Sequence, residues 1–243
     1  MKELATIRFI GIRMSRDFIT MILLLGVPII LITVFSIILG EVEGLSGTPI
    51  RDETVVLLVL GFQLFGGAIT MNYVHQDLFA ERKNRLLSLP MNTTLYGFSI
   101  MLAGIIYSIL LGIILITYTT MVFDVNWGNF IWALLVITLM SSLSSIVCLV
   151  FTFSVKNFKI AERLSEVYGV GMILLAGLFF PMPDNALINM FNDYVNPLML
   201  AYSSIDQVRS GGLSDGWLYA ALLSVLILIA FGLLLLTGRR RMP

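Results

Sequence analysis

Long runs of apolar residues dominate the chain, and polar residues gather between them. Six runs are long enough, or nearly so, for a helix to cross the roughly 30 Å apolar core of a bilayer, which takes about 20 residues. The runs cover residues 18–39, 54–74, 95–123, 130–154, 167–182 and 217–237. This pattern predicts an all-α integral membrane protein with six transmembrane helices, in which residues 1–243 form a single transmembrane domain.

The lysines and arginines between the runs are distributed unevenly. Of the 15 basic residues, all but Arg51 and Arg209 lie before the first run or after the second, fourth and sixth. Basic residues are retained on the cytoplasmic side of a membrane, so both termini are predicted to be cytoplasmic. The opposite loops are acidic, and the three tryptophans lie near the outer ends of runs, where an amphipathic ring favours the headgroup level.

Three shorter segments are predicted not to cross the membrane. Residues 1–17 place basic and apolar side chains on different helical sides, which indicates an interfacial helix or a simple basic anchor. Residues 76–89 contain helix formers and precede Pro90, which predicts a cytoplasmic helix that a soluble partner could bind, or a solvated loop. Residues 183–200 are half apolar, which predicts a re-entrant or interfacial hairpin on the outer side.

Composition strengthens the membrane interpretation. Hydrophobic residues make up 58% of the chain and charged residues 12%, whereas soluble domains carry about 25% charged residues. The net charge is zero, so nothing indicates a nucleic-acid partner. Cys148 is the only cysteine, which excludes an internal disulfide. The first run starts too late and is too long for a cleaved signal peptide.

Candidate chemistry is sparse. The chain has no Gly-Lys pair, and therefore no G-x-x-x-x-G-K-[ST] phosphate loop for ATP. His75 is the only histidine, so the H-E-x-x-H pattern of zinc proteases cannot occur. We therefore expect no catalytic, cofactor-binding or metal-binding residue, and no enzyme activity in this chain.

The six runs also contain no Asp, Glu, Lys, Arg or His within the limits given above. Proton-driven carriers and charge-selective channels place ionisable side chains inside their spans, so both classes are disfavoured. A sodium-coupled carrier that uses carbonyls and hydroxyls stays open. An energy source on another polypeptide would fit the absence of charge and the predicted cytoplasmic helix.

Three places in the chain resemble the ABC-2 type permease family, the membrane subunits of bacterial ATP-binding-cassette exporters. Arg13-Met-Ser-Arg-Asp-Phe18, with Pro28, is similar to the family's elbow helix and first span. Glu81-Arg-Lys-Asn-Arg-Leu-Leu-Ser-Leu-Pro90 is similar to its coupling helix. Gly177-Leu-Phe-Phe-Pro181 and Asn196-Pro-Leu-Met-Leu-Ala-Tyr202 resemble its re-entrant hairpin. The three segments occur in the family's order.

The resemblance implies a permease subunit of the bacterial cytoplasmic membrane. It pairs with a second permease subunit and with two cytoplasmic ATPase subunits, and ATP and Mg²⁺ bind to those ATPases. The residues it implies for ATPase coupling are Asp77, Glu81, Arg82, Arg85 and Leu86, and those for the re-entrant gate are Phe179, Phe180, Pro181, Asn196 and Pro197.

The cargo is less constrained by the sequence. The spans are rich in Phe and Met, whose adaptable surfaces suit amphipathic, antimicrobial or toxin-like peptides and hydrophobic drugs, although the same residues also face lipid. Two alternatives to an exporter subunit stay open: a carrier or channel that acts without an ATPase, and a membrane scaffold, sensor or immunity protein.

Overall fold

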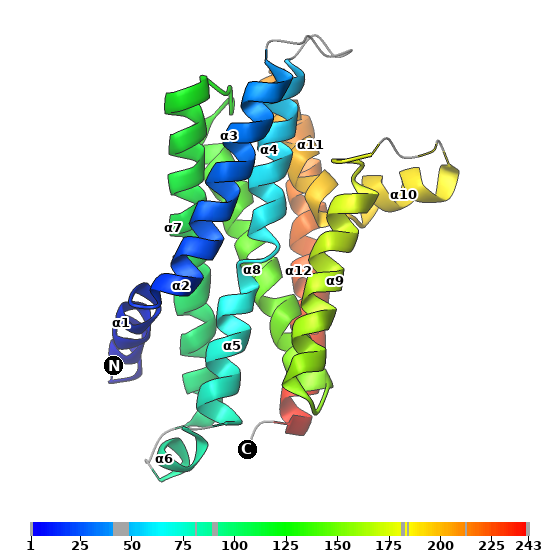
Figure 1. The fold of residues 1–243 in the computed structure, drawn as a ribbon. Coiled ribbons are helices and arrows are strands. Elements are labelled where there is room, and N and C mark those ends of the chain that lie inside the picture. Colours follow the sequence, from blue (N-terminus) through cyan, green and yellow to red (C-terminus); the bar gives the residue numbers. More distant parts are fainter. Residues whose placement is uncertain are drawn as a thin grey trace.

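A bundle of helices makes up the computed structural model, which describes residues 2–40, 49–80, 82–88, 92–180, 183, 185–211 and 213–241. Every element in these ranges is a helix. Figure 1 shows the long helices running side by side, with the N-terminal helix α1, the short helix α6 and the C-terminus at the same end of the bundle. We call this the lower end. The chain is thus an all-helical protein with both termini on one side.

Five helices among the described residues are long and apolar enough to cross a membrane. They are Phe18–Leu39, Ile50–Leu78, Thr93–Phe123, Phe130–Ser154 and Gly216–Arg241. The first and fourth agree with the runs in the sequence to the residue, and the others extend the predicted runs by one to four residues at one or both ends. These five helices and the apolar composition define a multi-pass membrane protein.

The first span combines three helical segments: α2 (Phe18–Met21), a π-helical turn (Ile22–Gly26) and α3 (Val27–Leu39). The Asp17 side chain caps its start by accepting a hydrogen bond from the Thr20 N–H at 3.4 Å. Pro28 follows the wide turn, and a proline cannot donate the backbone hydrogen bond that a regular helix requires there. Little of this span is buried inside the bundle.

The second span is interrupted near its middle, between α4 (Ile50–Gln63) and α5 (Gly67–Leu78). The interruption would leave buried backbone groups unpaired, and Ser144 of α8 pairs them. Its hydroxyl donates to the Leu64 carbonyl and accepts from the Gly67 N–H at 2.9 Å. A side chain at position 67 would place Cβ 2.3 Å from the Ser144 carbonyl oxygen, so this approach requires glycine.

The helix α8 (Phe130–Ser154) lies at the centre of the bundle and packs against α5, α7 (Thr93–Phe123) and α12 (Leu213–Arg241). Its inward side carries several serines. The Gln63 side-chain oxygen accepts hydrogen bonds from Ser108 of α7 at 2.9 Å and from Ser141 of α8 at 3.0 Å. Polar bonds between small residues therefore join the spans at mid-height, as is common between membrane helices.

The fifth predicted span differs from the structure. The run 167–182 was expected to be helical throughout, but the helix α9 is Phe158–Leu175. It begins nine residues earlier because the Asn157 side chain caps it, and it ends before Gly177, whose φ is 75°. Its first half carries the charged residues Lys159, Glu162, Arg163 and Glu166. The lack of charge thus applies to only part of this helix, and a sixth span stays a prediction.

The helix expected over residues 76–89 is also divided. α5 continues to Leu78, and after a turn a separate helix, α6 (Lys83–Leu87), follows. On the opposite side, the hairpin expected over 183–200 contains α10 (Ala186–Tyr194) and the start of α11 (Pro197–Arg209). α10 projects sideways from the bundle, whereas α11 lies within it (Figure 1). Part of each segment lies outside the described residues: Glu81 and Leu89 in the first, and Asp184 in the second.

Candidate functional site

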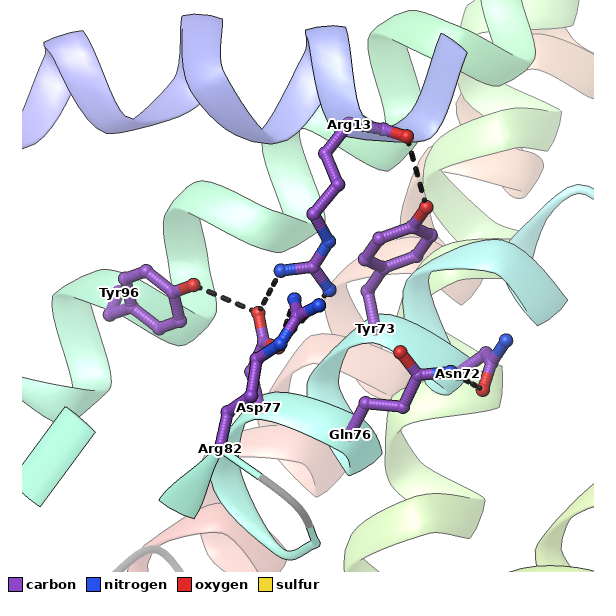
Figure 2. A network of polar contacts seen from close by, with 7 residues as sticks. All are labelled: Arg13, Asn72, Tyr73, Gln76, Asp77, Arg82 and Tyr96. Carbon is purple, nitrogen blue, oxygen red and sulfur yellow. Dashed lines mark hydrogen bonds and ion pairs between the residues drawn. The ribbon is translucent and has the colours of Figure 1, made fainter. Parts of the chain in front are cut away.

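A buried carboxylate, Asp77, forms the centre of a polar network at the lower end of the bundle (Figure 2). Its side chain is 1% exposed. The Arg13 guanidinium of α1 (Lys2–Ser15) donates to both carboxylate oxygens, at 2.9 and 3.1 Å. Arg82 donates to Oδ1 at 3.3 Å, and the Tyr96 hydroxyl of α7 donates to Oδ2 at 2.8 Å. Three parts of the chain, around Arg13, Asp77 with Arg82, and Tyr96, therefore meet at one side chain.

The two arginines offset the cost of burying the Asp77 charge. An unpaired carboxylate at this depth would be strongly unfavourable, and a forked guanidinium provides two charge-assisted hydrogen bonds in a fixed geometry. Burial by itself would lower the pKa of the Arg13 guanidinium, but the hydrogen bonds and charge of Asp77 outweigh it, so the pKa lies above its usual value. The Arg13 guanidinium therefore stays charged throughout the physiological range.

Tyr73 fixes the position of Arg13 from a second direction. The Arg13 Cζ lies 4.3 Å from the centre of the Tyr73 ring, and the Tyr73 hydroxyl donates to the Arg13 carbonyl at 3.3 Å. Cation–π stacking and the hydrogen bond together hold α1 against the bundle. Ile10 and Met14 of α1 are buried beside this contact, while Phe9 is exposed.

The short helix α6 extends from this junction. Arg82, directly before α6, is 46% exposed while it bonds to Asp77, so it links the enclosed carboxylate to the surface. Arg85 is exposed, and Leu86 is half-buried. Of the residues expected to couple to an ATPase, Asp77 and Arg82 are therefore together, Arg85 and Leu86 lie on α6, and Glu81 lies outside the described residues. Because Asp77 is enclosed, any part it takes in coupling acts through the positions of α1 and α6.

The residues expected at the outer gate are arranged around Asn196. This side chain is buried, caps α11 by accepting from the Leu198 N–H at 3.1 Å, and donates to the Met172 carbonyl of α9 at 3.0 Å. Asn192 of α10 donates to the Leu175 carbonyl near the end of α9 at 2.7 Å. Pro197 occupies the first turn of α11, where its missing N–H costs nothing. Asn196 and Pro197 thus join α9 to α11.

The two phenylalanines of the expected gate are more exposed. Phe180 is exposed, and the Phe179 ring lies 6.1 Å from that of Phe35 on α3. Pro181 lies outside the described residues. Phe179 therefore lies near the first span, whereas Asn196 joins α9 to α11.

A second buried ion pair lies at the upper end, and the pattern of the sequence gave no sign of it. Asp52 of α4 bonds to Arg209 of α11 at 3.2 Å, and both side chains are less than 10% exposed. Asp52 also accepts from the Asn126 N–H at 3.2 Å and from Arg51 at 3.4 Å. Arg51 and Arg209, the two basic residues that lie in loops predicted to be on the outer side, thus both bond to Asp52.

Catalytic and metal-binding arrangements are not found among the described residues. No group of three His, Cys, Asp or Glu side chains in that part of the chain is placed to hold a metal ion. A Gly-x-Ser-x-Gly spacing, typical of some hydrolase nucleophiles, occurs at residues 212–216. The only histidine, His75, is on α5, stacked 3.9 Å from the Phe158 ring, whereas α12 begins at Leu213, at the other end of the bundle (Figure 1).

The all-helical bundle and its apolar spans define a polytopic membrane protein. Comparison with protein families gives a match to the ABC-2 type transporter family over residues 5–208. Comparisons with curated proteins and with solved structures give no match. The matched region covers most of the 243 residues. The chain therefore belongs to the ABC-2 type transporter family. It is a permease component, and the membrane domain of this family is not itself catalytic.

Proposed function

We propose that this chain is the membrane permease subunit of an ATP-driven exporter in the bacterial cytoplasmic membrane. Two cytoplasmic ATPase subunits would bind ATP and Mg²⁺, and a second permease subunit would complete the membrane part. Membership of the ABC-2 type transporter family supports this assignment. The lower end of the bundle, with α1, α6 and the C-terminus, would face the cytoplasm because most basic residues lie there.

The observation that carries the proposal is the connection of α6 to three other helices through Asp77. Arg82 attaches the start of α6 to this carboxylate, and Arg13 and Tyr96 attach α1 and α7 to the same group. A force applied to α6 by a partner would therefore reach the first, second and third spans together. Arg85 is exposed on α6 and is available for contact with an ATPase.

Amphipathic peptides or hydrophobic drugs are the cargo that the chain suits best. The spans carry many Phe and Met side chains, which adapt to apolar surfaces of varied shape. The charged residues in the first half of α9 add polar groups beside this surface, which an amphipathic molecule also needs. The transport pathway would lie where two such bundles meet.

Affinity purification of the tagged chain from its own cells tests the assignment. We expect an ATP-binding-cassette ATPase to copurify in a fixed ratio and to hydrolyse ATP. Arg85→Glu should release the ATPase, because it reverses the charge on the exposed side of α6. Arg240→Glu is the matched control, since Arg240 is also exposed and belongs to the last turn of α12. Purification without any ATPase, or equal loss in both variants, would contradict the proposal.

A further inference from the structure

A cavity of about 410 Å³ lies at the lower end of the bundle, apart from the Asp77 junction. Its walls come from α5, α7, α8 and α12. Most of the lining is apolar, and Val74, Met101, Leu149 and Phe153 form its inner part. Phe98 of α7 and Leu235 of α12 line it as well and are about half exposed, so the cavity opens sideways between these two helices.

One charged side chain, Arg239, lines this cavity. It belongs to the last turn of α12 and is exposed. Arg239 forms no ion pair with any described residue, whereas Arg241 nearby donates to the Val155 carbonyl. The cavity therefore combines an apolar interior with a free positive charge at the end of the bundle.

These two features restrict the occupant. A sugar or nucleotide would leave polar groups unpaired against apolar walls, and a neutral hydrocarbon would not use the charge. An acyl chain matches the interior, and a phosphate matches an arginine at membrane-surface depth. The volume lies within the range of pockets that bind small molecules, and the sideways opening leads to the bilayer of a membrane protein.

We infer that this cavity is a binding site for an anionic glycerophospholipid, with one acyl chain between α7 and α12 and the phosphate at Arg239. The leaflet involved is the one at the end where both termini lie. The site is independent of any ATPase, and none of the residues that line it bonds to Asp77. The lipid would fill the space that the described helices leave between them.

Native mass spectrometry of the purified full chain tests this inference. The chain is incubated in detergent with equal amounts of phosphatidylglycerol and phosphatidylcholine that carry the same acyl chains. We expect preferential retention of phosphatidylglycerol. Arg239→Gln should lower that preference by about fivefold, the contribution expected of one basic residue beside an anionic headgroup. Arg240→Gln is the matched control, because Arg240 does not line the cavity.

A second pair of variants tests the acyl-chain site. Both Gly238 and Gly232 are on α12, and only Gly238 lines the cavity. A Cβ added at either glycine meets no atom within 4 Å. Gly238→Leu should fill the cavity and abolish retention of both lipids, whereas Gly232→Leu should retain them. Thermal unfolding followed by tryptophan fluorescence verifies that each variant is folded.

Several outcomes would overturn the inference. They are equal retention of the two lipids by the unsubstituted chain, an equal effect of the two arginine variants, and normal retention in Gly238→Leu. In a second incubation with equal amounts of phosphatidylglycerol and palmitate, preferential retention of palmitate would overturn the phospholipid assignment in favour of a free fatty acid. If Gly238→Leu does not fold, a phosphatidylglycerol with a photoreactive acyl chain gives the answer. Crosslinks to Phe98 or Phe231 support the site, and crosslinks only elsewhere exclude it.

Discussion

Asp77 is held by groups from α1, α7 and the turn before α6, and each group satisfies a different part of its carboxylate. Charged residues inside membrane proteins are costly and are retained in pairs. The Arg13 pair is bidentate, which makes arginine and lysine unequal at this position. Loss of the Arg13 guanidinium should therefore destabilise the fold.

Arg13→Gln should lower the free energy of unfolding by about 2 kcal/mol, because the buried Asp77 loses two charge-assisted hydrogen bonds. The stability of Arg13→Lys should lie between that of Arg13→Gln and that of the unsubstituted chain, since lysine keeps the charge but not the forked guanidinium. Thermal unfolding in detergent measures both. Arg16→Gln is the control, because Arg16 is exposed and on the same stretch of chain. Equal effects of Arg13→Gln and Arg16→Gln would contradict the role given to Asp77.

The ion pair at the upper end gives a second prediction. Arg209→Gln leaves the Asp52 carboxylate buried with weaker partners, so we expect a loss of about 3 kcal/mol in unfolding free energy. The exposed pair Arg163–Glu166 serves as control, because surface pairs contribute little. Arg163→Gln should leave the melting temperature unchanged. If Arg209→Gln also leaves the melting temperature unchanged, Arg209 does not stabilise the buried Asp52.

Local sequence could indicate which residues are charged, but not which of them are buried together. Asp77 was singled out within a segment expected to contact a partner, and its enclosure depends on Arg13, 64 positions away, and Tyr96, 19 positions away. Asp52 and Arg209 are 157 positions apart. Such pairs form when distant helices pack together, and the sequence of one segment does not show how it packs against another.

At the scale of helices, the ends were predictable where a cap coincides with the limit of an apolar run. The fourth span begins after Asn129, whose side chain accepts from the Ile131 and Trp132 N–H groups, and the apolar run starts at the same place. The α9 helix is the opposite case. Asn157 caps it before a charged stretch, so the helix begins where hydropathy is still low.

The interruption of the second span was not predictable, because the run 54–74 is continuous in hydropathy. Ser144→Ala removes the hydroxyl that pairs the Leu64 carbonyl and the Gly67 N–H. We expect a loss of about 1–2 kcal/mol in unfolding free energy, the upper part of the range for bonds between membrane helices. Ser142→Ala is the control, because Ser142 bonds only to its own helix at Thr138. Equal stability of the two variants would contradict the role of Ser144.

Whether α9 crosses the membrane can be tested directly. Its 18 residues span about 27 Å as a helix, close to the thickness of the apolar core. In a Cys148→Ala background, Lys156→Cys and Asn185→Cys place exposed thiols before and after α9. We expect a membrane-impermeant maleimide to label Asn185→Cys in intact cells and Lys156→Cys only after permeabilisation. Labelling of both from the same side would exclude a sixth span.

At the scale of the whole molecule, the two ends of the bundle have different characters. The lower end has α1, α6, the C-terminal arginines and the Asp77 junction, and the upper end has the Asp52 pair and the α10–α11 turn (Figure 1). The charge distribution in the sequence predicts this polarity, because basic residues cluster where both termini lie. Which end faces the cytoplasm stays a prediction of the charge rule.

Labelling of the two ends checks that orientation. In the Cys148→Ala background, Ser88→Cys lies after α6 and Ser210→Cys after α11, and both positions are exposed. Intact cells should label Ser210→Cys, and Ser88→Cys should react only in permeabilised cells. The reverse result would invert the topology. Tryptophan fluorescence melting verifies that neither substitution disturbs the bundle.

The distances in sequence around Asp77 also constrain the order in which the protein can be made. Arg13 is synthesised first, Asp77 follows 64 residues later, and Tyr96 follows after a further 19. Until the third span has left the ribosome, Asp77 lacks one of its partners and is incompletely covered. The complete set of contacts around Asp77 can therefore form only once the start of the third span has been made, whereas the Arg13 contacts to Tyr73 and Asp77 need only the second span.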